Sequence, residues 1–140
     1  MATTGKRRTT VLLVDDEPFF LQLLSDFFTE EEFGVITAAN GGDAVARARK
    51  HRPDLILLDL HMPAPDGLAT CKTLKADKAT REIPVIILTA EESTELNQMA
   101  FDAGAQVTAL KSMKLDRLMN IVDVVLQTRK LPDPRILPEA

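Results

Sequence analysis

One stretch of this chain reads Asp54-Leu55-Ile56-Leu57-Leu58-Asp59-Leu60-His61-Met62-Pro63, an apolar run that ends in a carboxylate and then enters a proline-containing loop. Because the run is apolar on both faces and is bounded by turn residues, it is typical of a strand buried on both sides in a parallel sheet. Asp59 then lies at the carboxyl end of that strand. Ligands of open α/β sheets bind at this edge, so we take Asp59 as the centre of the candidate site.

Similar apolar runs alternate with helical segments along the whole chain. Strands are predicted at residues 9–14, 35–39, 55–59, 83–88 and 107–110, and helices after Pro18, after the turn at 40–43, and at 67–75, 93–103 and 114–128. The turn Asn40-Gly41-Gly42-Asp43 is expected to cap the second helix, Asp66 is a candidate N-cap, and Gly104 is a candidate C-cap. Five strands that alternate with five helices predict a doubly wound α/β fold with a five-stranded parallel sheet.

The first and last helices carry apolar stripes that we expect to pack on the sheet. The first helix shows apolar residues at helical spacing, namely Phe20, Leu23, Leu24 and Phe27, widened by Phe19, Leu21 and Phe28. The last helix places one stripe at Leu115, Leu118, Met119, Val122, Val125 and Leu126.

Composition restricts the class of protein. With 140 residues, 45% hydrophobic and 27% charged, the chain has the balance of one soluble globular domain. The net charge of −4 argues against a nucleic-acid partner, because phosphate neutralisation needs clustered Lys and Arg. No apolar stretch approaches the roughly 18 residues of a membrane span, and the single Cys71 excludes an internal disulfide. We therefore expect a cytoplasmic protein with no membrane partner, in which Cys71 fills a helix packing site.

Polar residues follow several of the predicted strands. Asp15 and Asp16 follow the first, Asp59 ends the third, Thr89 follows the fourth, and Lys111 follows the fifth. Parallel strands bring these ends to one edge. Crowded carboxylates repel one another, and a hard cation such as Mg²⁺ relieves that repulsion. Lys111 adds a fixed positive charge and Thr89 adds a hydroxyl donor. Together these side chains suit a phosphoryl group on Asp59.

Each of these residues also has an ordinary structural explanation. Acidic residues before a helix complement its dipole, a threonine at a strand end is common, and a lysine there usually points to solvent. The five groups together, each at a strand end, favour a shared functional site.

Four segments resemble the receiver domain of two-component response regulators, a flavodoxin-like fold. They are Val11-Leu12-Leu13-Val14-Asp15-Asp16-Glu17, Asp59-Leu60-His61-Met62-Pro63 with Asp66-Gly67, Ile83-Pro84-Val85-Ile86-Ile87-Leu88-Thr89-Ala90, and Ala103-Gly104-Ala105 with Lys111. The resemblance covers about residues 9–128 and implies the strand order 2-1-3-4-5. Residues 1–8 then form a flexible N-terminal arm and residues 129–140 a proline-containing tail.

The resemblance implies a role for each site residue. Asp59 would accept a phosphoryl group from a histidine kinase or a histidine phosphotransfer protein, and Thr89 and Lys111 would contact the phosphoryl oxygens. Mg²⁺ would be held by the side chains of Asp15, Asp16 and Asp59 and by the backbone carbonyl of His61. His61 and Glu91 would border the pocket and modulate water attack. Phosphotransfer is self-catalysed, so a turnover enzyme is not expected.

Two positions depart from the family pattern. The switch position on the fifth strand, usually aromatic, is Thr108, whose short side chain cannot fill the space that a moving threonine leaves. The residue after Lys111 is Ser112 rather than proline. A cis bond before a residue other than proline costs ~2.5–4 kcal/mol, so we predict a trans bond, a rearranged loop and a displaced Lys111. Ser112 is then a candidate cap for the last helix.

The leading hypothesis is a stand-alone response regulator that signals through protein contacts. The expected output surface, and a candidate homodimer surface, combines residues 93–103, 107–110 and 114–128, with Phe101, Ile121 and Val124 partly exposed. Two alternatives are a phosphorelay intermediate or phosphate sink, which Thr108 favours, and a phosphorylation-independent binding module. A haloacid-dehalogenase-type phosphatase is disfavoured, because His61 stands where that family has a second aspartate.

Overall fold

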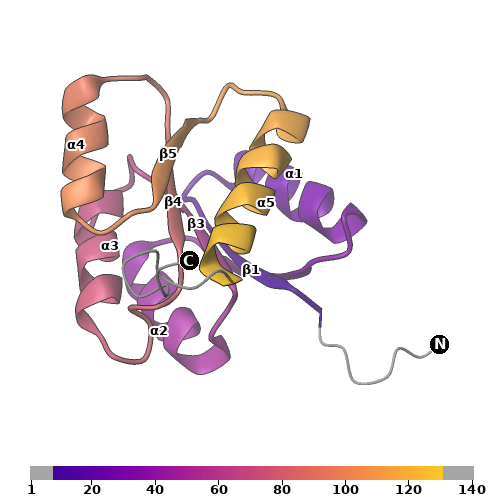
Figure 1. The fold of residues 1–140 in the computed structure, drawn as a ribbon, viewed down its shortest axis with the longest axis horizontal. Coiled ribbons are helices and arrows are strands. Elements are labelled where there is room, and N and C mark those ends of the chain that lie inside the picture. The colour runs from indigo at the N-terminus through magenta and orange to yellow at the C-terminus, as the bar shows by residue number, and fades with distance from the viewer. Residues whose placement is uncertain (1–7, 131–140) are drawn as a thin grey trace, which may run out of the picture.

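A five-stranded parallel sheet with the order β2-β1-β3-β4-β5 forms the centre of the computed structural model, which describes residues 8–130 (Figure 1). The strands are β1 Thr10–Val14, β2 Gly34–Ala38, β3 Leu55–Asp59, β4 Val85–Thr89 and β5 Val107–Leu110. The helices are α1 Pro18–Glu30, α2 Gly41–His51, α3 Gly67–Ala76, α4 Thr94–Asp102 and α5 Leu115–Lys130. The predicted fold class and strand order are confirmed. Residues 1–7 of the predicted arm and 131–140 of the predicted tail lie outside the described residues.

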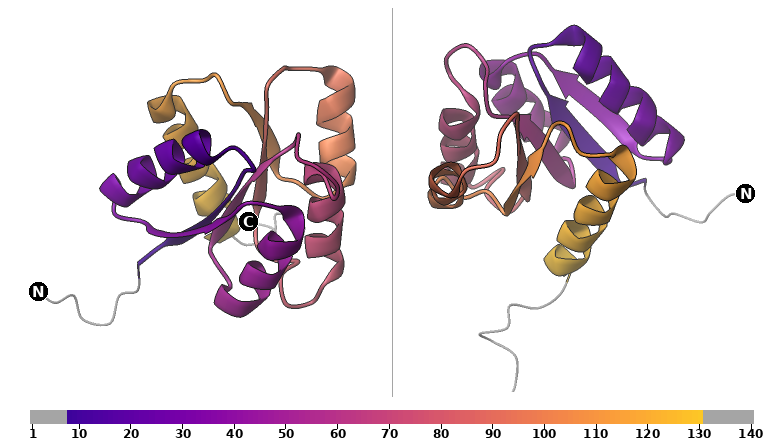
Figure 2. Two further views of the ribbon diagram at one scale, coloured as in Figure 1. Left: turned by 180° about the vertical axis from the view of Figure 1, so that it is seen from behind. Right: turned by 90° about the horizontal axis from the view of Figure 1, so that it is seen from above.

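Helices cover both faces of the sheet. Figures 1 and 2 show α2, α3 and α4 on one face and α1 and α5 on the other. Because successive strand residues point to opposite faces, each face has its own apolar cluster. Leu12, Ile56 and Ile87 belong to the cluster under α2, α3 and α4. Leu13 and Leu57 belong to the cluster under α1 and α5.

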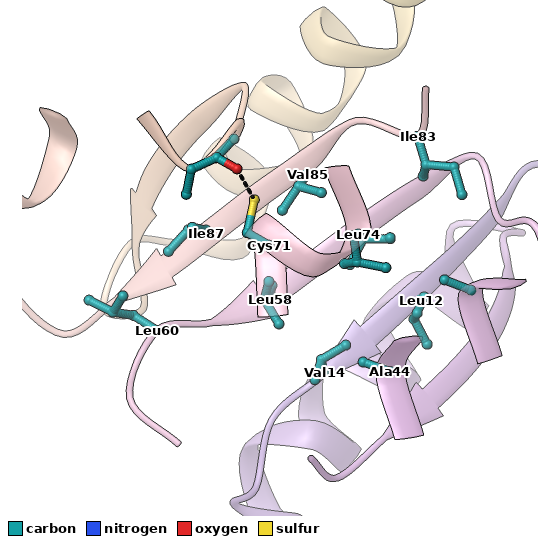
Figure 3. Close-up of a cluster of buried hydrophobic side chains, with 14 of the residues drawn as sticks. Leu12, Val14, Ala44, Leu58, Leu60, Cys71, Leu74, Ile83, Val85 and Ile87 are labelled. Carbon is teal, nitrogen blue, oxygen red and sulfur yellow. Dashed lines mark hydrogen bonds between the residues drawn. The ribbon is translucent and has the colours of Figure 1, made fainter. Parts of the chain in front are cut away.

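Cys71 lies inside the first of these clusters, as predicted. Its side chain is fully buried on α3, and Figure 3 shows its thiol directed at a backbone carbonyl. The Sγ donates to the carbonyl of Ala103 at 3.4 Å. Burial raises the pKa of the thiol to about 11, although Lys75 lowers it in part. Cys71 is therefore a packing residue rather than a nucleophile.

Helix ends follow the predicted capping residues. Asn40 accepts a hydrogen bond from the backbone N–H of Asp43 at 2.8 Å, and Asp66 accepts one from that of Ala69 at 2.9 Å. Gly104 follows α4 with a φ of +102°, a left-handed conformation that glycine adopts without strain. Within residues 8–130, no helix has the length and hydropathy needed to cross a bilayer.

The predicted inner face of α1 is wrong at two positions. Leu24 and Phe28 are buried, whereas Leu23 is 42% exposed and Phe19 is 80% exposed. Leu24 and Phe28 lie one turn apart and face the sheet, and the rotation of about 100° from Leu24 to Leu23 leaves Leu23 partly in solvent. Phe19 lies in the first turn of α1, immediately after the acidic segment that follows β1.

Candidate functional site

Strand register brings the predicted site residues to one edge of the sheet. Val14 of β1 pairs with Leu58 of β3, so Asp15 follows β1 at the level of Asp59. Asp59 pairs with Leu88 of β4, and Thr89 ends that strand. These residues are far apart in the sequence and meet because all the strands run in the same direction.

Three carboxylates gather at this edge. Asp15, Asp16 and Asp59 each offer an oxygen, and these atoms all lie within 4.8 Å of one another. Asp15 Oδ1 accepts a hydrogen bond from the Glu17 backbone N–H at 2.9 Å. Asp15 Oδ2 is buried and is paired with the Lys111 ammonium. This one ammonium only partly balances three clustered carboxylates, so the cluster fits a hard divalent cation.

Lys111 lies in the pocket, so the predicted displacement is wrong. Its Nζ is 2.8 Å from Asp15 Oδ2 and 3.4 Å from Asp59 Oδ1. The Lys111–Ser112 bond is trans as predicted, because the only cis bond among residues 8–130 is Ala64–Pro65. The Lys111 backbone N–H donates to the Thr89 carbonyl at 2.8 Å, which fixes the strand end without a proline.

Ser112 does not cap α5, in contrast to the prediction. The helix begins at Leu115, and the backbone N–H groups of Arg117 and Leu118 donate to the carbonyl of Lys114. The N-terminal end of the helix is thus two residues further along the chain than a Ser112 cap requires.

The charges at the site depend on one another. Burial and the neighbouring Asp15 raise the pKa of Asp59, although Lys111 and a backbone hydrogen bond from His61 oppose that rise. Burial opposes the charge on Lys111, but Asp15 and Asp59 outweigh it and raise the pKa of the ammonium. Lys111 therefore remains a fixed positive charge between two carboxylates at neutral pH.

The loop after β3 is packed tightly against the Asp59 backbone. The Gly67 N–H donates to the Leu60 carbonyl at 3.0 Å. A Cβ at position 67 would lie 2.4 Å from the Asp59 carbonyl oxygen and 2.7 Å from the Leu60 Cα. Only glycine permits this approach, which places the start of α3 directly over the end of β3.

The Thr89 hydroxyl is hydrogen-bonded to the loop that follows β4. It donates to the Glu91 carbonyl at 3.0 Å and lines a cavity of about 280 Å³ between α4 and β5. Thr108, at the predicted switch position, lines the same cavity. Its hydroxyl donates to Asn97 Oδ1 of α4 at 2.6 Å. A polar link from β5 to α4 therefore occupies the position that an aromatic side chain has in the family pattern.

A separate cavity of about 430 Å³ opens over Asp59. It is lined by Asp16, Glu17, Pro18, Asp59, His61, Ala90 and Lys111. His61 thus borders the site as predicted, whereas Ala90 rather than Glu91 lies on its wall. The sequence did not reveal Phe20 as a site residue. Its ring centroid lies 4.5 Å from Lys111 Nζ, but its place in the apolar stripe of α1 indicated only a core residue.

A family model described as the response regulator receiver domain matches residues 11–123. This chain belongs to that family. Receiver domains carry an acidic pocket that generally binds Mg²⁺, interact with histidine kinases or phosphotransfer proteins, and signal through contacts with other proteins. They are signalling proteins rather than classical enzymes.

Individual relatives agree with this assignment. The receiver domain is 33% identical over 116 residues to protein PilH of Pseudomonas aeruginosa, covering 83% of this chain and 96% of PilH. It is 37% identical over 116 residues to the response regulator PleD of Caulobacter vibrioides, covering 83% of this chain and 24% of PleD. The chain spans less than half the length of several such relatives.

Solved structures support the same fold. The Vibrio cholerae chemotaxis protein CheY4 superposes with a TM-score of 0.82 at 30% identity, over 85% of this chain and 99% of that one. A Francisella response regulator receiver domain gives a TM-score of 0.80 at 28% identity, over 88% of this chain and 100% of that one.

Proposed function

We propose that Asp59 accepts a phosphoryl group from a phosphohistidine donor and that the resulting change is transmitted through protein contacts. One observation carries this proposal: Asp59 is 2% exposed, lines an open cavity, and shares the Lys111 ammonium with Asp15. An Asp59 oxygen attacks the phosphorus, a P–O bond forms, and the P–N bond to the donor imidazole breaks. The imidazole leaves with the electron pair and takes up a proton.

The acidic cluster supplies the metal site for this transfer. We propose that Asp15, Asp16, Asp59 and the backbone carbonyl of His61 hold Mg²⁺. A bound Mg²⁺ would neutralise charge that builds up on the phosphoryl oxygens. The clustering of the three carboxylates supports this assignment most directly, because one oxygen of each lies within 4.8 Å of the others and the Lys111 ammonium balances only part of their charge.

Lys111 and Thr89 have different starting positions. The Lys111 ammonium already lies 3.4 Å from Asp59 Oδ1, so a small movement brings it to a phosphoryl oxygen. The Thr89 hydroxyl must first leave the Glu91 carbonyl and turn toward the phosphoryl group. Phosphorylation thereby favours a different rotamer of Thr89 and a different loop after β4.

The test is incubation with Mg²⁺ and acetyl phosphate, followed by intact-protein mass spectrometry. Wild-type protein should gain one acid-labile phosphoryl adduct, and Asp59→Asn should gain none. Asp54→Asn is a suitable control, because Asp54 immediately precedes the same strand, at the opposite end from Asp59, and its substitution should leave the adduct unchanged. No adduct on wild type, or one that persists in Asp59→Asn, would refute the proposal and leave a phosphorylation-independent binding module.

The donor surface is proposed to include Phe19. Its ring is 80% exposed in the first turn of α1, and the preceding Pro18 lines the cavity over Asp59. A donor protein that brings its phosphohistidine to Asp59 must approach this turn, and an exposed aromatic ring beside the site provides apolar contact area for it.

The output surface is proposed to comprise α4, β5 and α5. Phe101 is 71% exposed and Val124 is 62% exposed, and Ile121 is half-buried and packs on the cluster under α1 and α5. A cavity of about 440 Å³ next to these elements is lined largely by apolar residues, including Val107 and Ile121. Apolar surface of this kind suits a downstream protein or a second copy of the chain.

A phosphorelay intermediate or phosphate sink is the second candidate, and the Thr108–Asn97 hydrogen bond favours it. The bond ties β5 to α4 in the absence of an aromatic switch, so phosphorylation need not repack the output surface. Amide chemical shifts of α4 and β5 with and without beryllofluoride separate the two functions. Large changes support the signalling output, and changes confined to the Asp59 pocket support the relay.

A further inference from the structure

The loop after Lys111 lacks the proline that usually shapes it in the family. Other contacts must therefore hold the Lys111 side chain in the pocket. Its backbone is fixed by the N–H contact to Thr89, but a flexible stem of four carbons separates that backbone from the ammonium. The side chain is nevertheless held inward, with 20% of its surface exposed. Asp15 and Asp59 attract the ammonium from two strand ends.

Phe20 provides a third contact from α1. Its ring centroid lies 4.5 Å from Lys111 Nζ, within the range of a cation–π interaction. The ring is half-buried and packs on the apolar cluster between the sheet, α1 and α5, so its orientation is fixed by the core. The ammonium therefore lies between a rigid aromatic face and the acidic pocket.

We infer that Phe20 is a positioning residue for phosphoryl transfer, which holds the Lys111 ammonium at the pocket without neutralising it. An additional carboxylate would also hold the ammonium, but it would cancel the charge that the phosphoryl oxygens need. An aromatic face attracts a cation through its quadrupole and carries no net charge. The attraction is also broad, so Lys111 can shift from Asp15 toward a phosphoryl oxygen and keep its contact with the ring.

Since this role rests on the proposed function, the experiment compares variants by the rate of adduct formation with acetyl phosphate and Mg²⁺. Phe20→Leu should lower that rate by about two- to five-fold, the factor expected for loss of an exposed or partly exposed cation–π contact. Phe20→Tyr keeps the aromatic ring and should form the adduct at the wild-type rate. Phe27→Leu is the matched control, because Phe27 is half-buried on the same helix and packs in the same cluster but lies about two turns away from the Phe20–Lys111 contact.

A double-mutant cycle distinguishes a role of Phe20 in positioning Lys111 from a general structural effect of the substitution. Phe20→Leu should have no further effect in a Lys111→Met background. An undiminished rate in Phe20→Leu, or an equal loss with and without Lys111, would overturn the inference.

A second readout is independent of phosphorylation. The Hε protons of Lys111 should show an upfield ring-current shift in wild type that disappears in Phe20→Leu. If wild type forms no adduct, the proposed function fails. The contact between Phe20 and Lys111 is then tested by the ring-current shift alone. If wild type shows no such shift, the contact is refuted.

Discussion

Asp15 has one carboxylate oxygen that accepts a backbone hydrogen bond and one that is paired with the Lys111 ammonium, and both belong to the acidic cluster. Mg²⁺ at this position should stabilise the folded state by about 1.4 kcal/mol at ten times its Kd, because the unfolded chain does not hold the three carboxylates together. Asp15→Asn should lose most of that stabilisation. Thermal unfolding in Mg²⁺ and in EDTA measures it, and Asp123→Asn, an exposed position on α5, serves as the control. An equal Mg²⁺ effect in Asp15→Asn would exclude Asp15 as a ligand.

Cys71 should make the protein sensitive to alkaline pH. The folded-state pKa of about 11 exceeds the ordinary value of 9.0, so the folded state binds the thiol proton more tightly than the unfolded state does. Its contribution to stability is complete below pH 9 and is lost as the pH rises toward 11. Denaturant titrations at pH 8 and pH 10.5 should therefore show a steeper loss in wild type than in Cys71→Ala. A parallel loss in the two proteins would contradict this expectation.

Most of the site residues could be predicted from the sequence, and each wrong or missed prediction has a physical cause. Asp15, Asp59 and Lys111 follow strands whose register could be inferred from apolar runs, and the structure brings them together. The predicted displacement of Lys111 is wrong because proline is only one way to fix a strand end, and because the carboxylates attract the ammonium directly. Phe20 was missed because a ring in an apolar stripe gives no sequence signal for the cation beside it.

At the scale of elements, the start of α3 is set by Gly67. Gly67→Ala should destabilise the fold by about 1–3 kcal/mol, because the new Cβ meets backbone atoms that cannot move independently. Gly42→Ala is the matched control at the start of α2, where the nearest atom to a new Cβ is 3.5 Å away. That variant should be neutral or slightly stabilising. Urea denaturation compares the two, and equal stabilities would show that the β3–α3 junction tolerates a Cβ.

Element boundaries and element faces were predictable to different degrees. Capping residues such as Asn40 and Asp66 carry a local signal, and both helices begin where they indicate. The buried face of α1 could not be predicted as well, because seven apolar residues cover more than one side of the helix. The position of the sheet decides which of them are buried, and the sequence of a single helix does not reveal that position.

At the scale of the whole molecule, the exposed Phe19 predicts a dependence on the donor. Phe19→Ala should reduce phosphotransfer from a phosphorylated histidine phosphotransfer protein by about ten-fold, in the range of an interface hot spot. The rate with acetyl phosphate should not change, because a small donor needs no docking surface. Rapid-quench transfer assays with both donors measure this difference. A loss of equal size with both donors would place the effect at the Asp59 pocket rather than at the interface.

The division of the core into two clusters determines how the domain can open locally. Ala100 is the only fully buried residue within α4, whereas all five residues of β3 are buried. Elements with little buried apolar surface unfold locally at low free-energy cost. Amide hydrogens of α4 should thus exchange with deuterium well before those of β3. Opening of α4 disturbs the cluster it shares with α2 and α3 and the Thr108–Asn97 bond to β5, so such excursions leave the α1 and α5 layer intact.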